Sequence, residues 1–106
     1  IILMIEARKD AVTEIASGFG QLGVPAERLA KTAAGRLKGY VASGAFAGPY
    51  LADQLLLPFA LAGGGTFTTV KPSGHLLTAI EIAQRFLDTP ISLKLGDCGR
   101  HLLTFG

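Results

Sequence analysis

A histidine at the expected start of a helix is the feature of this sequence that is best suited to chemistry. Ser73 is a good helix N-cap, and His75 follows it in the expected first helical turn. The positive end of the helix dipole disfavours an imidazolium ion there, so we expect a neutral ring. The free N–H groups of the same helix end can hold an anion. A neutral imidazole beside a bound anion suits nucleophilic attack on a phosphate.

A carboxylate and an amide interrupt a second segment that is otherwise apolar. Residues 49–62 are predicted to form a helix that begins at Pro49 and is bent or restarted at Pro58. Asp53 and Gln54 lie inside it, where a carboxylate costs free energy unless it is paired or faces a cleft. Both side chains could equally lie on the exposed side of the helix, and the spacing alone does not decide.

Two further groups of residues are weaker candidates. Gly63–Gly65 follow a helix and precede a strand without the Gly-Lys-Ser/Thr of a phosphate-binding loop, so they are interpreted as a helix stop. Asp97, Cys98 and His101 lie in and beside a hairpin turn, but no second pair of ligands completes a four-coordinate site. The sequence therefore predicts no metal site in this segment.

The elements that must position these residues form an α+β pattern within one domain, residues 1–106. Ala11–Gly20 fits a helix or a strand, and we expect a strand because Gly18 and Gly20 weaken a helix. Helices are expected over 25–43, 49–62 and from Ser73 to about Asp88, with a small-residue linker over 43–48. Strands are expected over 1–8, 11–20, 66–70, 91–95 and 100–105; the first and second, and the last two, form hairpins. The first strand is apolar nearly throughout and is predicted to be central.

Composition indicates that part of the surface is normally covered. Apolar residues make up 49% of the 106 residues, whereas charged residues make up 17%, below the quarter or so of typical domains. We expect the remainder of a longer chain or a second subunit to cover one face. The net charge of +2 is too small to argue for nucleic-acid binding, and the cations of the first helix are interpreted as a solvated face.

Compartment signals are few but agree with one another. The single cysteine, Cys98, excludes an internal disulfide and agrees with a reducing compartment. No signal peptide is visible, and the longest apolar run, Leu55–Ala62, is far shorter than the roughly 20 residues of a membrane helix. These features predict a cytoplasmic protein without a membrane partner.

An ordered set of motifs resembles the C-terminal part of the RNA 3'-terminal phosphate cyclase family. The chain carries YLADQ at Tyr50–Gln54, then LxLPxALAGxG, then FTT, and then PSGH at Pro72–His75 followed by LT. The similarity runs from about Val12 to Leu95, and the order of the motifs is more specific than any one of them. The resemblance implies the fold of the C-terminal domain of translation initiation factor 3, with two helices on a mixed four-stranded sheet. It also implies that the chain is about the last third of a longer cyclase.

The family's reaction is implied by the same resemblance. His75 would attack the α-phosphate of ATP to form a covalent histidine–AMP, AMP would pass to an RNA 3'-phosphate, and the product would be a 2',3'-cyclic phosphate. Tyr50 would stack on adenine, Asp53 and Gln54 would hydrogen-bond the nucleotide, and Leu51 and Ala52 complete that segment. Mg²⁺ is implied, with its ligands outside this chain.

The sequence departs from the family pattern at Ala79, where family members commonly carry Asn. Two alternatives stay open beside the cyclase. One is a non-catalytic relative that acts in RNA processing, against which the presence of His75 argues. The other is a folded segment that associates with itself through its apolar face.

Overall fold

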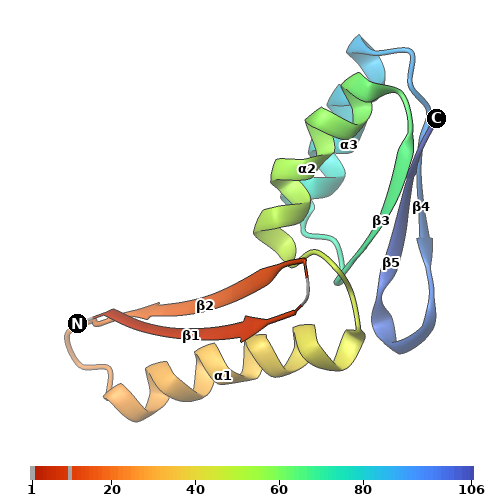
Figure 1. Cartoon of the computed structure of the whole chain (residues 1–106). Coiled ribbons are helices and arrows are strands. Elements are labelled where there is room, and N and C mark those ends of the chain that lie inside the picture. Colours follow the sequence, from red (N-terminus) through yellow and green to blue (C-terminus); the bar gives the residue numbers. More distant parts are fainter. Residues whose placement is uncertain (1, 10) are drawn as a thin grey trace. The chain divides into compact units, whose positions relative to one another are not determined.

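The computed structural model describes residues 2–9 and 11–106 and has an α+β architecture, as predicted (Figure 1). The chain divides into two compact units, residues 1–42 and 43–106, which are described separately below. Within the described residues, no helix combines the length and the apolar character that crossing a lipid bilayer requires.

The first unit is a β-hairpin followed by a long helix. β1 (Ile2–Arg8) pairs antiparallel with β2 (Thr13–Phe19), and the hairpin confirms the choice of a strand over a helix for the second segment. The N–H of Lys9 donates to the carbonyl of Val12 at 2.8 Å and closes the turn; Asp10, predicted to share that turn, lies outside the described residues. α1 (Ala26–Ser43) follows and buries Ala33, Leu37 and Tyr40, as its 3.6-residue period predicts, but Val41, which the same period places on the buried stripe, is 53% exposed.

The prediction that the first strand is central is wrong. Among the described residues β1 has one partner strand, β2, and its side chains alternate between exposed and half-buried. Ile2 and Met4 are 64% and 63% exposed. An apolar run marks a central strand only when both faces are covered, and in this hairpin one apolar face of β1 remains uncovered.

The second unit packs two helices on a three-stranded sheet. Its elements are α2 (Pro49–Ala62), β3 (Gly65–Thr69), α3 (Gly74–Phe86), β4 (Ile91–Leu95), a short 3₁₀ turn η1 (Asp97–Gly99) and β5 (His101–Phe105). The strand order is β3-β5-β4 with both pairs antiparallel, so the predicted C-terminal hairpin is confirmed. The expected single mixed sheet of four strands is not observed, because the first hairpin forms a sheet of its own in the other unit.

Local signals set the ends of both helices in this unit. Gly63 ends α2 in the left-handed region at φ 75°, and its N–H donates to the carbonyls of Phe59 and Ala60, which confirms the predicted helix stop. α2 continues through Pro58 without restarting. The Ser73 hydroxyl accepts from the N–H of Leu76 at 3.1 Å and caps α3, also as predicted.

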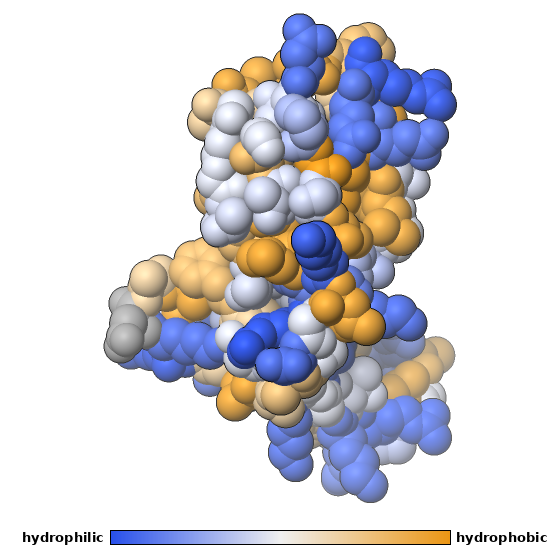
Figure 2. Space-filling model, turned by 90° about the vertical axis from the view of Figure 1, so that its right-hand side faces the viewer, coloured by the Kyte–Doolittle hydropathy of each residue, from blue (hydrophilic) through white to orange (hydrophobic). Residues whose placement is uncertain are grey.

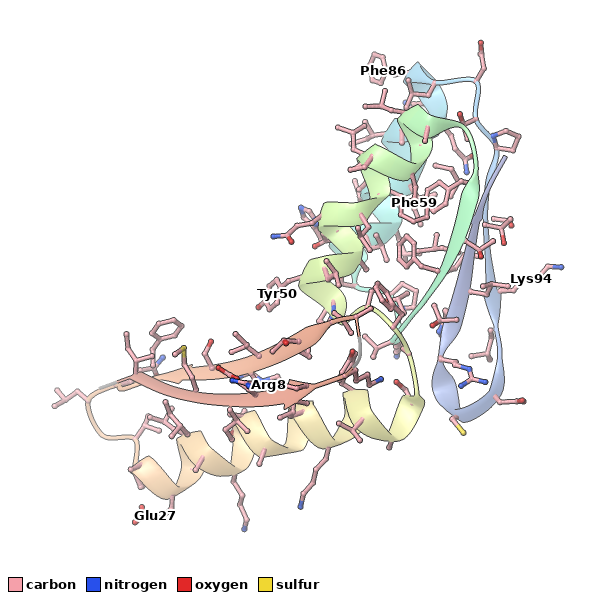
Figure 3. All side chains as sticks on the ribbon, in the orientation of Figure 1. Arg8, Glu27, Tyr50, Phe59, Phe86 and Lys94 are labelled. Carbon is pink, nitrogen blue, oxygen red and sulfur yellow. The ribbon has the colours of Figure 1, made fainter. Side chains whose placement is uncertain are left out.

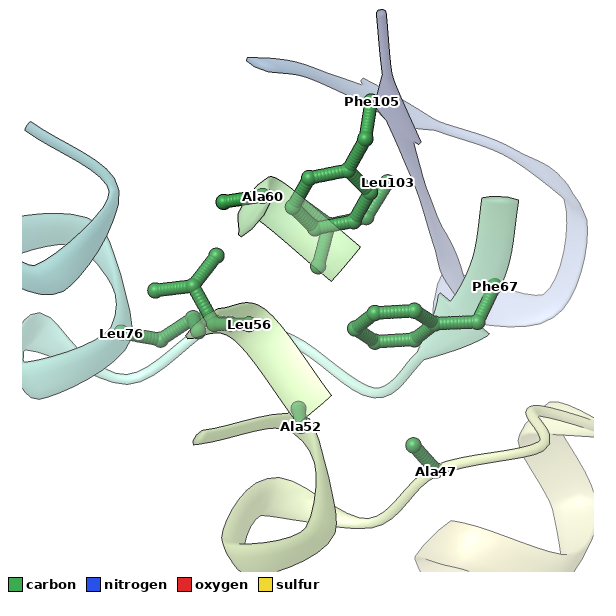
Figure 4. Packing of buried hydrophobic residues seen from close by; sticks show 8 residues of the cluster. All are labelled: Ala47, Ala52, Leu56, Ala60, Phe67, Leu76, Leu103 and Phe105. Atoms are coloured by element: carbon green, nitrogen blue, oxygen red, sulfur yellow. The ribbon is translucent and has the colours of Figure 1, made fainter. Parts of the chain in front are cut away.

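A compact apolar core lies between the helices and one face of the sheet (Figure 4). Phe67 and Phe105 stack with ring centroids 5.9 Å apart, and Phe59 of α2 lies 5.1 and 5.3 Å from them. Leu76 of α3 and Leu103 of β5 are almost fully buried in the same cluster. This core fixes α2 and α3 against one sheet face.

The first turns of α2 and α3 lie at the same end of this unit. Ala47, just before α2, pairs with Thr69 at the last position of β3, and α3 begins after the short connection 70–73. At the other end, the hydroxyl of Thr89, which follows α3, donates to the carbonyl of Ala60 in the last turn of α2 at 2.9 Å. The two helices therefore run in the same direction, with their N-termini together (Figure 1).

Candidate active site

His75 and Asp53 meet where the two helices begin. His75 is the second residue of α3, and Asp53 lies in the second turn of α2. The Nδ1 atom of His75 lies 3.2 Å from Oδ2 of Asp53. The imidazole is 79% exposed and the carboxylate 26% exposed, so the ring is open to a ligand while the acid is largely enclosed.

This contact bears on which nitrogen of His75 is free. The carboxylate beside Nδ1 favours the neutral tautomer that carries its proton there, and the lone pair of that tautomer resides on Nε2. An acid that holds the imidazole in one tautomer and orientation is the arrangement found in nucleophile–base–acid constellations. In that tautomer Nε2 is the free nitrogen of an exposed ring.

The second oxygen of Asp53 lacks a partner among the described residues. Oδ1 is buried and accepts no hydrogen bond there. Buried polar atoms in native proteins are nearly always paired, so this oxygen suits a donor from a bound molecule. A carboxylate accepts from a hydroxyl or amine, or binds a cation such as Mg²⁺, and it repels a phosphate. Asp53 thus fits a hydrogen-bond donor of a bound nucleoside.

Two positive helix ends face the same region. At the start of α3, Ser73 takes up the N–H groups of Leu76 and Leu77, but in the described structure those of Gly74 and His75 donate to no acceptor. The start of α2 adds a second dipole end. Free N–H groups and the positive ends of helix dipoles favour an anion such as a phosphate, so this region suits an anion beside an exposed imidazole.

The predicted nucleotide-binding segment divides by exposure. Tyr50 is 69% exposed on the first turn of α2 (Figure 3), and Gln54 is also exposed. Ala52 is fully buried and Leu51 packs against the core. The side chains of Tyr50, Asp53 and Gln54 can therefore meet a ligand, whereas Leu51 and Ala52 serve the core.

Two other positions from the sequence can now be placed. Ala79 follows His75 by one turn of α3 and is half-buried against the core. Cys98 is exposed at φ 57°, and His101 lies on β5 with a buried Nδ1. Across the described part of the chain, no three His, Cys, Asp or Glu side chains are grouped to hold a metal ion.

The sequence did not reveal that Asp53 lies beside His75. The resemblance assigns Asp53 to the nucleotide and gives it no role toward His75. The two residues lie on different helices, and periodicity does not say how two helices align. The only sequence signal is the order helix–strand–helix with short connections, which brings both helix starts to one end of the strand between them.

Comparison with known proteins gives the family. A sequence profile described as RNA 3'-terminal phosphate cyclase matches residues 3–93. A protein of that name from Koribacter versatilis is 49% identical over 105 residues, which cover 96% of this chain and 29% of the relative. Proteins of the same name from Ralstonia nicotianae and Salmonella enteritidis are 46% and 42% identical and cover 87% and 93% of the chain.

The chain therefore belongs to the RNA 3'-terminal phosphate cyclase family. It spans 26 to 29% of the length of these three relatives. The matched range begins in β1 and ends in β4, so it includes all three helices and both parts of the His75–Asp53 pair.

Proposed function

We propose that this chain supplies the nucleophile and part of the nucleotide site of an ATP-dependent RNA 3'-terminal phosphate cyclase. In this proposal the chain is a single domain and the C-terminal third of a longer cytoplasmic enzyme. The observation that carries the proposal is the contact between Asp53 and the Nδ1 atom of His75 where two helices begin. Membership of the family supplies the substrate class.

The chemistry follows from the nitrogen that the contact leaves available. Nε2 of His75 attacks the α-phosphorus of ATP, a P–N bond forms, and the bond to the leaving pyrophosphate breaks. An RNA 3'-phosphate oxygen then attacks the same phosphorus and takes the AMP, which frees Nε2. Finally the neighbouring 2'-hydroxyl attacks the RNA phosphate, AMP leaves, and a 2',3'-cyclic phosphate remains.

The residues of the first turns of α2 have separate tasks in this proposal. The exposed ring of Tyr50 stacks on adenine. Asp53 Oδ1 accepts a hydrogen bond from the nucleoside, and the Gln54 amide donates to it or accepts from it. The free N–H groups at the start of α3 stabilise the phosphate under attack. Mg²⁺, whose ligands come from outside this chain, neutralises the remaining phosphate charge when it is bound.

Exposed apolar side chains support a larger assembly. Both units expose large hydrophobic residues, and apolar surface is visible between the polar side chains in Figure 2. Examples with more than 60% exposure are Phe19, Leu61 and Phe86. We propose that the remainder of the cyclase, or a second subunit, covers such residues. The likeness of this chain to the C-terminal domain of translation initiation factor 3 stays a prediction.

Labelling with ATP tests the proposal. The chain, and the longer enzyme that contains it, are incubated with Mg²⁺ and ATP radiolabelled at the α-phosphate, and acid-labile, alkali-stable label is counted on the protein. We expect label on His75 that is abolished in His75→Asn and kept in His101→Asn, the matched control at the only other histidine. Absence of label on the longer enzyme would refute the cyclase and favour a non-catalytic RNA-processing relative. A dimer of the chain without label would favour the self-associating segment.

A further inference from the structure

The segment just before α2 is joined to the end of β3 by three hydrogen bonds. The N–H of Phe46 donates to the Thr68 hydroxyl, and the N–H of Ala47 donates to the Thr68 carbonyl, both at 3.0 Å. The Thr69 hydroxyl donates to the carbonyl of Ala47, also at 3.0 Å. Residues 46 and 47, expected to be part of a linker, instead pair in parallel with the strand edge.

Of these three hydrogen bonds, the one from the Thr69 hydroxyl to the Ala47 carbonyl is buried. Thr69 is 1% exposed and Ala47 is fully buried, whereas Thr68 is only half-buried. Removing a buried donor leaves its acceptor unpaired where water does not readily replace it. Loss of the Thr69 hydroxyl should therefore cost more than loss of the hydroxyl of half-buried Thr68.

Both helices of the candidate site, α2 with Asp53 and α3 with His75, begin close to these hydrogen bonds. Ala47 directly precedes Gly48, the N-cap of α2, whose carbonyl accepts from the N–H of Ala52. Thr69 leads through residues 70–72 to Ser73, the N-cap of α3. A displacement between Ala47 and Thr69 shifts the first turn of one helix against that of the other. It therefore changes the separation of Asp53 and His75.

We propose that Thr69 is a positioning residue that keeps the carboxylate of Asp53 on the Nδ1 atom of His75. It touches neither substrate nor the reacting atoms and acts through the spacing of two helix starts. Its catalytic consequence rests on the proposed function, since only a reactive His75 makes the spacing matter. Its structural consequence, the tautomer of His75, does not depend on that function.

Ring ¹⁵N NMR of the uniformly labelled chain tests the structural consequence without ATP. In the wild type we expect the proton of neutral His75 on Nδ1, with the resonances assigned by His75→Asn. Thr69→Val keeps the side-chain shape but removes the donor, and it should move a measurable share of the proton to Nε2. Thr69→Ser keeps the hydroxyl and should keep the wild-type tautomer. Thr104→Val, at a half-buried threonine on β5, controls for losing a hydroxyl from the sheet.

The outcomes separate positioning from general support of the fold. A folded Thr69→Val with the wild-type tautomer overturns the proposal. A folded Thr69→Ser that loses the wild-type tautomer also overturns the proposal. If Thr69→Val does not fold, the result for Thr69→Ser decides the question. Loss of the Nδ1 tautomer in Thr69→Val with retention in Thr69→Ser and Thr104→Val supports it.

A double-mutant cycle with ATP labelling tests the catalytic consequence. At saturating ATP, Thr69→Val should slow labelling of His75 by up to about 100-fold, the scale of a misplacement of roughly 1 Å. In the Asp53→Asn background the same change should alter the rate by less than about twofold, because the contact it protects is already lost. Equal losses in both backgrounds would contradict positioning through Asp53. If the wild type takes up no label, the proposed function fails while the NMR result still decides the role of Thr69.

Discussion

Oδ2 of Asp53, on the second turn of α2, lies 3.2 Å from Nδ1 of His75, on the first turn of α3. The pair places an acid behind an exposed imidazole and directs Nε2 outwards. The two helices begin together because β3 runs between them and is bonded to the segment before α2. A carboxylate on the second turn of α2 thus lies beside the imidazole on the first turn of α3.

Asp53→Asn should slow labelling of His75 at saturating ATP by about 100-fold, because the neutral amide removes the carboxylate charge and can turn its NH₂ donor toward the ring. The matched control is Glu81→Gln, which removes the same charge from an exposed pair with Arg85 on α3 and should leave the rate unchanged. The measurement is single-turnover uptake of α-phosphate label. An unchanged rate at saturation, with only weaker ATP binding, would show that Asp53 serves the nucleotide alone.

The features that could be predicted from the sequence are those that depend on residues close together in the chain. Ser73 as a cap and Gly63 as a stop are confirmed because hydrogen bonds within one turn determine them. The pairing of Asp53 with His75, and of residues 46 and 47 with β3, was missed because both depend on how separate elements align. The apolar run of β1 was misread because composition does not tell a covered face from an uncovered one.

Tyr50→Ala should weaken ATP binding by about 1–3 kcal/mol, the usual value of stacking a base on an aromatic ring. Tyr50 is 69% exposed, so the loss should come from the ligand contact rather than from the core. Tyr50→Phe is the matched control, since it keeps the ring, and it should bind ATP as the wild type does. Isothermal titration calorimetry measures both. Equal losses in the two variants would point to the hydroxyl and against stacking.

Gly65→Ala should destabilise the second unit by about 1–3 kcal/mol. Gly65 has φ +117°, and an added Cβ would lie 2.8 Å from the Phe59 ring, which Phe67 and Phe105 hold in place. Gly64→Ala is the control next to it, because its Cβ would meet nothing closer than 3.9 Å. Urea unfolding measures the two free energies. A Gly65→Ala variant as stable as Gly64→Ala would mean that the ring moves aside.

Deprotonation of Tyr40 should lower the stability of the first unit at alkaline pH. Burial, and secondly the Glu14 carboxylate, raise the pKa of Tyr40 above its ordinary value of 10.0, while the Lys9 ammonium lies 4.5 Å from its ring centroid. The unfolded chain then loses this proton at a lower pH than the folded chain. The contribution of Tyr40 is therefore complete below pH 10 and declines as the pH rises towards the folded pKa, by at most about 1.4 kcal/mol per pH unit.

Absorbance titration at 295 nm measures this pKa in Tyr50→Phe, where Tyr40 is the only tyrosine, and the midpoint should lie above 10.0. Adding Glu14→Gln should lower the midpoint only partly, because burial is the larger cause of the raised pKa. A midpoint at or below 10.0 would contradict the burial of this hydroxyl.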